Sequence, residues 1–225
     1  MLQRVRKIFQ SGASPANLEA GPPPMMPGVL RRSNGLREFL VGWDKETGRR
    51  LLDLGCTSSA NLNYFTELGH SIHSDDLLLE AFRPTYLRPA APAPGETAAA
   101  AVFDSDAWLR DNLVFEPERF DAVLLWDLVD YMPEPLVRPL LQRLTEILRP
   151  GGTILAYFHT RDAGPDAPFF RYHIHDRESL QLRPGQPYRL QRIFNNRHVE
   201  NLFRGYRSVK FFLARDNLRE VLATK

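Results

Sequence analysis

Two kinds of apolar pattern alternate along the chain. Short apolar runs are typical of buried strands, and they cover 50–55, 70–76, 100–104, 120–129 and 153–159. Stretches with apolar residues three or four positions apart predict helices at 36–43, 60–69, 77–82, 105–113, 134–149 and 198–206. Two last runs around Asp216 and Asn217 predict an antiparallel hairpin. This alternation predicts an α/β fold with a parallel sheet covered on both faces.

Chain length and proline content suggest how the sequence is divided. At 225 residues the chain is long enough for one substantial domain. The stretch GPPPMMP at 21–27 cannot sustain helix or sheet, so residues 1–35 are interpreted as an N-terminal extension or linker and 36–225 as the domain. Two loop insertions are expected inside it: 84–99, rich in proline and alanine, and 161–188, polar and irregular.

Composition and charge indicate which classes of protein the sequence favours. Hydrophobic residues make up 43% and charged residues 25%, the balance of an ordinary soluble globular protein. The formal net charge of +2 gives no dominant field, so nucleic-acid binding is unsupported. No apolar run approaches the roughly 20 residues of a transmembrane segment. The single cysteine, Cys56, cannot form an internal disulfide, which agrees with a reducing compartment, and a cytoplasmic location is predicted.

Acidic residues lie at the carboxyl ends of four of the expected strands. In chain order, these strand ends carry Asp53 and Gly55, Asp75 and Asp76, Asp104, and Trp126 and Asp127. In an open parallel sheet, ligands bind beyond the carboxyl ends of the strands. Four successive ends with acidic residues therefore indicate a binding site along this edge.

The order and spacing of the motifs resemble those of class I S-adenosylmethionine-dependent methyltransferases. The matching stretches are LLDLGCTSSANL (51–62), HSDD (73–76), FDAVLLWDLVDYMP (120–133) and ILRPGGTILAYF (147–158). The resemblance covers roughly residues 36–160, and the final helix and hairpin also resemble the family's. It implies a Rossmann-like, doubly wound, mostly parallel seven-stranded sheet with a C-terminal antiparallel hairpin. It also implies S-adenosyl-L-methionine as the cofactor.

The resemblance implies that the first strand end holds the methionine part of the cofactor. Gly55 would let the backbone approach it, Cys56 would give a backbone contact, and Asp53 would accept from its amino group. The family pattern D-x-G-x-G-x-G is altered here, because Thr57 and Ser59 replace the second and third glycines. A positive φ at Thr57 would cost roughly 1 to 2 kcal/mol. Alternatively, the hydroxyls of Thr57, Ser58 and Ser59 donate to a carboxylate and cap the next helix.

The next two strand ends are implied to hold the nucleoside part of the cofactor. Asp76 would accept from the two ribose hydroxyls, with Asp75 as the alternative. Asp104 and Ser105 would meet the adenine edge. Each aspartate also has a structural interpretation as a helix cap or turn former. Ser105 is expected to cap the helix that follows it.

The fourth strand end is implied to lie near the sulfonium, lined by Trp126 and Asp127. A core role explains Trp126 equally well. Methyl transfer is an in-line displacement that needs a base only when the nucleophile carries a proton. The candidate catalytic residues are Tyr131, for which packing is the favoured explanation, and His173. The histidine and cysteine spacing does not match a zinc site, so no metal is predicted.

The predicted function is S-adenosylmethionine-dependent methyl transfer to a small-molecule acceptor. The absence of a basic stripe and of a large appended domain favours a small molecule, although the fold itself does not choose the acceptor. The alternative is a non-catalytic Rossmann-like domain, descended from a methyltransferase, that senses a ligand or binds a partner. The glycine-poor loop and the lack of a clear base suggest that alternative.

Overall fold

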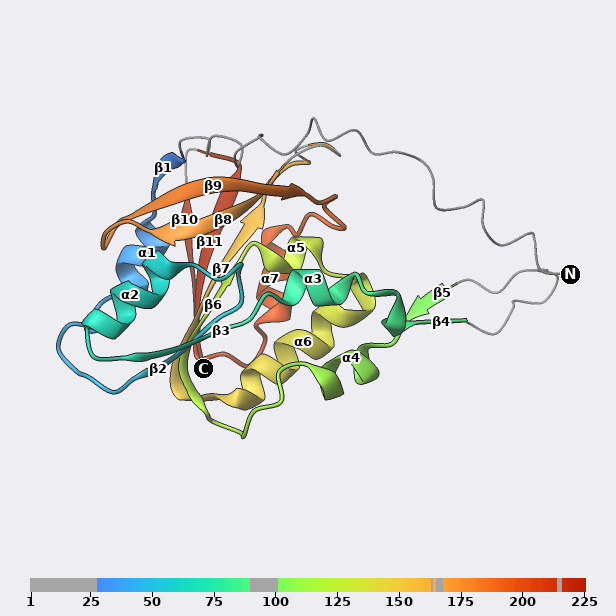
Figure 1. Ribbon diagram of the computed structural model, residues 1–225, viewed down its shortest axis with the longest axis horizontal. Helices are drawn as coiled ribbons and strands as arrows, with labels where there is room; N and C mark the ends of the chain where they lie inside the picture. The colour runs from blue at the N-terminus through green and yellow to red at the C-terminus, as the bar shows by residue number, and fades with distance from the viewer. Residues whose placement is uncertain (1–27, 90–100, 163, 165–167, 214–215) are drawn as a thin grey trace, which may run out of the picture.

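A six-stranded sheet runs through the centre of the molecule (Figure 1). The computed structural model describes residues 28–89, 101–162, 164, 168–213 and 216–225. In sheet order, the strands are β10 (Ser208–Leu213), β11 (Leu218–Thr224), β7 (Leu148–His159), β6 (Phe120–Trp126), β2 (Arg50–Asp53) and β3 (Ser71–Ser74). The four strands from β7 to β3 are parallel, while β11 runs antiparallel to β7 and to β10.

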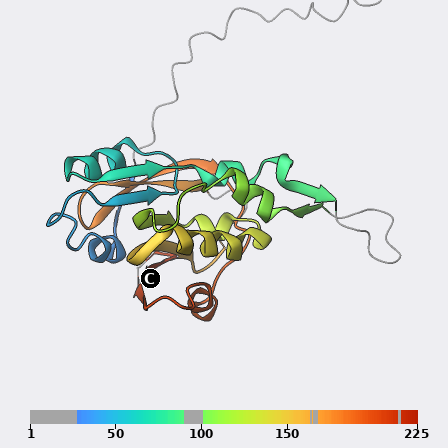
Figure 2. The same ribbon diagram turned by 90° about the horizontal axis from the view of Figure 1, so that it is seen from below.

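The predicted α/β class, with a mostly parallel sheet and a C-terminal antiparallel hairpin, is confirmed. The main sheet has six strands where seven were expected. The expected strand at 100–104 is β5 (Ala101–Phe103), which pairs with β4 (Leu87–Pro89) in a separate two-stranded sheet that projects from the body (Figures 1 and 2). Only Phe103 of β5 is buried, so the strand lacks the apolar faces of a central strand.

Helices cover both faces of the main sheet. Their bounds are α1 (Asn34–Phe39), α2 (Ser59–Glu67), α3 (Leu77–Ala81), α4 (Ser105–Asp111), α5 (Leu128–Tyr131), α6 (Glu134–Ile147) and α7 (Asn196–Leu202), with a 3₁₀ turn at Pro84–Tyr86. Alternate residues of β6 point to opposite faces, because side chains alternate along a strand. Val123 and Leu125 pack with α3 to α7, whereas Leu124 packs with α1 and α2.

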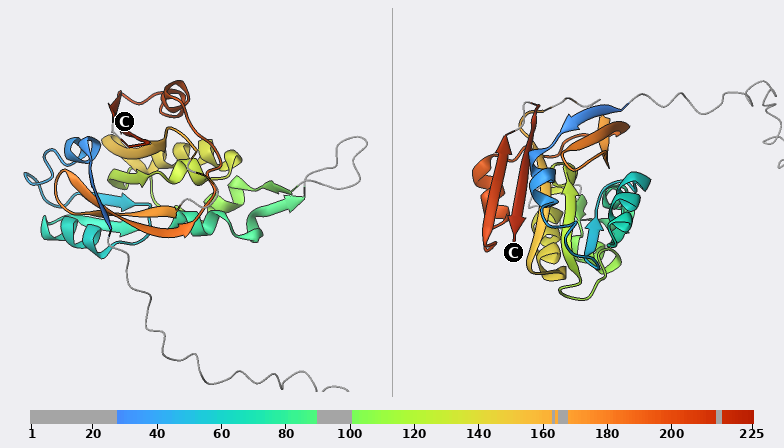
Figure 3. Two further views of the ribbon diagram at one scale, coloured as in Figure 1. Left: turned by 90° about the horizontal axis from the view of Figure 1, so that it is seen from above. Right: turned by 90° about the vertical axis from the view of Figure 1, so that its left-hand side faces the viewer.

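A second, three-stranded antiparallel sheet crosses one face of the molecule (Figure 3, right). It consists of β1 (Val29–Arg32), β9 (Ser179–Pro187) and β8 (Pro168–Ile174). The insertion 161–188, expected to be irregular, is therefore largely a hairpin. Its strands bury Tyr172, Ile174 and Leu180 against the face that also carries α1 and α2. Strand β1 lies inside the segment that was interpreted as a linker.

Parts of two expected segments lie outside the described residues. These are residues 1–27 of the expected extension and 90–99 of the expected insertion 84–99. The described start of that insertion forms the 3₁₀ turn and β4. No helix within the described ranges has the length and apolar character needed to cross a bilayer.

Candidate functional site

The carboxyl ends of the four parallel strands lie side by side, as their register requires. Asp53 of β2 pairs with Ser74 of β3, and Trp126 of β6 pairs with Ala156 of β7. The residues that follow these strands therefore share one edge of the sheet. The structure brings together the first, second and fourth predicted strand ends there, while Asp104 follows β5 in its separate sheet.

Asp53 is a buried carboxylate whose acceptors are filled by its own chain. Its Oδ1 accepts from the Gly55 backbone N at 3.2 Å and from the Trp126 indole Nε1 at 2.6 Å. Its Oδ2 accepts from Asn61 Nδ2 at 2.9 Å. Burial raises the pKa of Asp53, while these hydrogen bonds oppose that shift. Asp53 thus links Gly55, Asn61 and Trp126 through three hydrogen bonds.

Trp126 explains why residue 55 is a glycine. A Cβ atom added at Gly55 would lie 2.7 Å from Cδ1 of the Trp126 ring, closer than packed atoms approach. The φ of Gly55 is not positive, so steric room rather than backbone freedom is required. Trp126 itself has a φ of 49°, an uncommon conformation for a bulky residue. Its ring stacks on Tyr172 at 5.0 Å and is fully buried.

The turn after Gly55 avoids the strain that its missing glycines suggested. Among the described non-glycine residues, positive φ occurs at Leu113, Glu118 and Trp126, so neither Thr57 nor Ser59 adopts it. Ser58 is the N-cap of α2 and accepts from Asn61 N at 3.2 Å. The loop therefore bends differently from a glycine-rich loop, and a hydroxyl of its polar run caps the next helix.

Strand β8 closes over this loop. The Asn61 side chain donates to the Tyr172 carbonyl at 3.0 Å and accepts from Ile174 N at 2.7 Å. The Ser58 hydroxyl lies 2.7 Å from Nδ1 of His173. Burial lowers the pKa of His173, with Arg183 and Arg171 adding to the effect. His173, a candidate catalytic residue, is thus hydrogen-bonded to the loop that precedes α2.

Asp75 and Asp76 lie between β3 and α3 and differ in their contacts. Asp76 occupies the N-cap position of α3, yet its side chain makes no capping hydrogen bond. The Cys56 thiol lies beside it, and burial, followed by Asp76, raises the pKa of Cys56 to about 12. Cys56 is therefore a thiol and not a thiolate. The Asp75 backbone N donates to the Asp53 carbonyl at 2.9 Å, extending the β2–β3 pairing.

Asp104, rather than Ser105 as expected, is the N-cap of α4. Its Oδ1 accepts from Ala107 N at 2.9 Å, and its Oδ2 forms an ion pair with Arg88. The capping bond is the main cause of the lowered pKa of Asp104. Ser105 begins the helix, and its buried hydroxyl has no hydrogen-bond partner. Helix capping and the ion pair thus account for the side chain of Asp104, whereas the hydroxyl of Ser105 has no hydrogen-bond partner among the described residues.

The surroundings of Asp127 differ from those of Asp53. Asp127 is fully buried at the end of β6, and its carboxylate oxygens make no hydrogen bond of regular geometry, although the Tyr172 hydroxyl and Nε2 of His159 lie beside them. Nε2 of His159 lies 3.8 Å from its Oδ2. Burial raises the pKa of Asp127 to about 7, although His159 and the Tyr172 hydroxyl favour the ionised form. A buried carboxyl group without hydrogen bonds is costly, and such groups mark functional sites.

His159 and Asp130 are two residues of this edge that the sequence interpretation missed. His159 is the last residue of β7, and its Nδ1 lies 2.9 Å from Oδ2 of Asp130. The same oxygen accepts from the His159 backbone N at 2.5 Å. Tyr131 packs edge-on against the His159 ring at 5.6 Å, so packing accounts for it. The strand-end rule would have found His159, because it closes the fifth predicted strand as the acids close the others.

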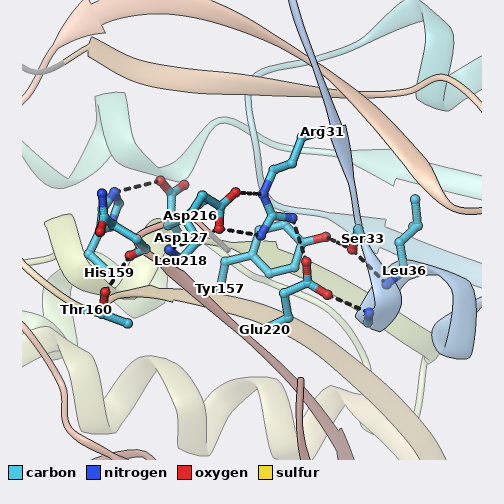
Figure 4. Close-up of polar contacts among 12 residues, drawn as sticks. Arg31, Ser33, Leu36, Asp127, Tyr157, His159, Thr160, Asp216, Leu218 and Glu220 are labelled. Carbon is cyan, nitrogen blue, oxygen red and sulfur yellow. Dashed lines mark hydrogen bonds and ion pairs between the residues drawn. The ribbon is translucent and has the colours of Figure 1, made fainter. Parts of the chain in front are cut away.

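A cavity of about 1020 Å³ opens beside His159, between β1 and the start of β11. Its polar wall is an ion-pair cluster in which Arg31 contacts Asp216 at 2.5 Å and Glu220 at 2.6 Å (Figure 4). Its apolar wall includes the exposed side chains of Val29 and Leu213. The cavity therefore lies at the carboxyl end of β7, one strand away from Asp127.

The sequence profile of the methyltransferase domain family matches residues 29–206 of the chain. The chain therefore belongs to this family, and the resemblance to class I S-adenosylmethionine-dependent methyltransferases is confirmed. The cofactor of that class is S-adenosylmethionine. No curated protein matches the sequence significantly.

Several solved structures are similar to the chain at low identity. An S-adenosylmethionine-dependent methyltransferase from Mesorhizobium loti is 18% identical over 84% of this chain and 95% of its own, with a TM-score of 0.49. The 1,6-didemethyltoxoflavin-N1-methyltransferase of Burkholderia thailandensis is 16% identical over 86% and 79%, with a TM-score of 0.43. Human N-acetylserotonin methyltransferase is 13% identical over 85% and 50%, with a TM-score of 0.43.

The described residues fit S-adenosylmethionine at three places, two of them on this edge and one, Ser105, after β5 of the separate sheet. Asp127 offers two unpartnered carboxylate oxygens, which suit a cationic group. Asp76 offers a carboxylate that does not cap its helix, and Ser105 an unpartnered hydroxyl. The donor set differs from expectation at the methionine end, because Asp53 is filled internally.

Proposed function

We propose that this chain transfers the methyl group of S-adenosylmethionine to a small-molecule acceptor. The unpartnered, fully buried carboxylate of Asp127 carries the proposal. An ionised group without hydrogen bonds costs several kcal/mol in a protein interior, so a cation that restores its partners is strongly favoured. S-adenosylmethionine supplies two such charges, its ammonium and its sulfonium. Membership of the methyltransferase domain family supports the same ligand.

The cofactor residues of this proposal follow the strand ends. Asp76 accepts from the ribose hydroxyls, because its oxygens are not used to cap α3. Ser105 contacts the adenine edge, and Gly55 and Cys56 contribute backbone contacts. Asp53 acts indirectly, since its three hydrogen bonds hold Gly55 and Trp126 in place.

Methyl transfer itself needs little covalent help from the protein. The bound cofactor supplies an electrophilic methyl carbon, and the chain aligns the acceptor with it and excludes water. The cavity beside His159 is the place proposed for the acceptor, and its size suits a small molecule. The proposed cellular location is the cytoplasm.

A second candidate function is ligand sensing or partner binding without catalysis. The observation that favours it is the filled methionine end of the loop, where the Trp126 ring occupies the space next to Gly55. In that case the edge would bind a ligand but release no methylated product.

The test is calorimetric titration of the folded protein with S-adenosylmethionine. Asp76→Ala is expected to weaken binding about 10- to 100-fold through the loss of two charge-assisted hydrogen bonds. The matched control, Asp75→Ala, removes the neighbouring carboxylate and is expected to leave the affinity within about twofold. Absence of binding by the folded wild-type protein rejects the proposed function. Unchanged binding by Asp76→Ala rejects the ribose assignment alone.

A further inference from the structure

His159 is held in one orientation by Asp130. Oδ2 of Asp130 accepts from the His159 backbone N at 2.5 Å, so this oxygen acts as an acceptor, and Nδ1 of the ring lies 2.9 Å from it. Nδ1 therefore carries a proton and donates, which leaves Nε2 as the basic nitrogen of the neutral ring. Nε2 is directed to Asp127, whose Oδ2 lies 3.8 Å away (Figure 4).

The same imidazole forms part of the cavity wall, so it lies between the cavity and Asp127. The charges on that wall largely cancel, because two arginines, Arg31 and Arg32, face two acids, Asp216 and Glu220, and Arg31 pairs with both acids. Much of the remaining wall is apolar, with Phe170 and Leu218 among its residues. A neutral, largely apolar molecule fits this lining better than an ion does.

We propose that the methyl acceptor is a neutral, largely apolar molecule that binds in this cavity, and that Nε2 of His159 takes the proton from its nucleophilic O–H or N–H group. This inference rests on the proposed function. The acceptor's lone pair forms the new bond to the methyl carbon while the carbon–sulfur bond breaks, and its electron pair stays on sulfur. The acceptor's proton passes to Nε2, leaving imidazolium. Asp130 is a positioning residue, since it acts through His159.

Charged groups around the imidazole set its readiness to accept a proton. Burial lowers the pKa of His159, but Asp130, Asp127 and Asp162 raise it by more, so the net shift is upward. The other titratable groups on packed elements are the buried Tyr131, which faces the ring, and Arg219 of β11, which faces Asp130. A cation bound at Asp127 would oppose the upward shift and so favour the neutral form of the His159 ring.

The experiment follows the His159 ring by NMR in histidine-¹⁵N-labelled full-length protein. Spectra are recorded from about pH 5 to about 9, alone, with S-adenosylmethionine and with S-adenosylhomocysteine. Comparison with His159→Gln assigns the ring. We expect Nε2 to titrate and Nδ1 to stay protonated. We expect the acid dissociation constant to be about tenfold larger with S-adenosylmethionine than with its uncharged thioether product.

Phenol serves as the acceptor probe in the same samples. It is expected to shift the Nε2 resonance of His159 but not the ring signals of His198, which lies outside this cavity. Asp130→Asn is expected to lower the pKa of His159, because the carboxylate that faces Nδ1 loses its charge. His198→Gln, a matched control, should leave every His159 signal in place.

Three results would overturn the inference. The first is an identical His159 titration with both bound ligands, and the second is an Nε2 that keeps its proton over the whole range. The third is a phenol titration that leaves Nε2 unshifted. Calorimetry on the same samples distinguishes these three results from a failure of the proposed function. If the proposed function is wrong, neither S-adenosylmethionine nor S-adenosylhomocysteine gives a heat of binding.

Discussion

The ends of β2 and β6 carry buried aspartates with opposite surroundings. Asp53 is 1% exposed and accepts three hydrogen bonds from its own chain. Asp127 is 0% exposed and accepts no hydrogen bond of regular geometry, with the Tyr172 hydroxyl and His159 as its polar neighbours. Both acids follow adjacent parallel strands, so position alone does not separate them. The difference teaches that a strand-end acid is structural when neighbouring donors fill it and available for a ligand when they do not.

The largest expected effect is on stability and separates these two aspartates. Asp53→Asn removes the charge and one acceptor from three buried donors, and we expect a loss of about 2 to 4 kcal/mol in the free energy of unfolding. Asp127→Asn breaks no hydrogen bond, and at about pH 8 we expect its stability to equal or exceed that of the wild type by about 0 to 2 kcal/mol. Urea denaturation measures both.

The pH dependence of folding stability also tests the difference between Asp127 and Asp53. The pKa of Asp127 is raised to about 7 in the folded protein, above its value in the unfolded chain. The folded state therefore prefers the protonated form, and the resulting stability is present at low pH and lost as pH rises through about 7. Asp127→Asn should remove this decline. Equal losses of stability in both variants, or an unchanged decline, would contradict the comparison.

A smaller loss of stability is expected for a substitution at Gly55. This substitution tests whether the loop that Asp53 holds is tightly packed. Gly55→Ala would place a methyl group 2.7 Å from the buried Trp126 ring. We expect a loss of about 1 to 3 kcal/mol, because the indole must move and its bond to Asp53 must stretch. In a double-mutant cycle with Trp126→Leu, most of that loss should disappear. Additive losses would show that the ring and the glycine are independent.

Much of the fold could be predicted because its local patterns agree with its tertiary structure. The run at 120–126 is buried along most of its length, and the strand and helix order places it in the centre of a parallel sheet. The hairpin of β8 and β9 was missed, although Tyr172 and Ile174 alternate with polar residues. Proline and charge in that segment hid the period of two, and its partner strand β1 lies more than a hundred residues away in the sequence.

The site was predicted less completely, because residue type does not reveal hydrogen-bond partners. Asp53 and Asp127 are equivalent in the sequence, and only the positions of Asn61 and Trp126 show that Asp53 is filled. His159 had a detectable signal as the last residue of a strand. Its partner Asp130 lies on α5, a short helix that follows β6 and not β7. No regular spacing in the sequence therefore relates Asp130 to His159.

The measurement that tests the central claim most directly is calorimetric titration of wild type and Asp127→Asn with S-adenosylmethionine and S-adenosylhomocysteine at about pH 8. The two ligands differ in the charge on sulfur. Because Asp127 is the unpartnered acid, we expect the variant's affinity for the sulfonium form, relative to the thioether form, to fall about tenfold while the protein stays folded. An unchanged ratio together with wild-type affinity would show that Asp127 does not meet the cofactor's charge.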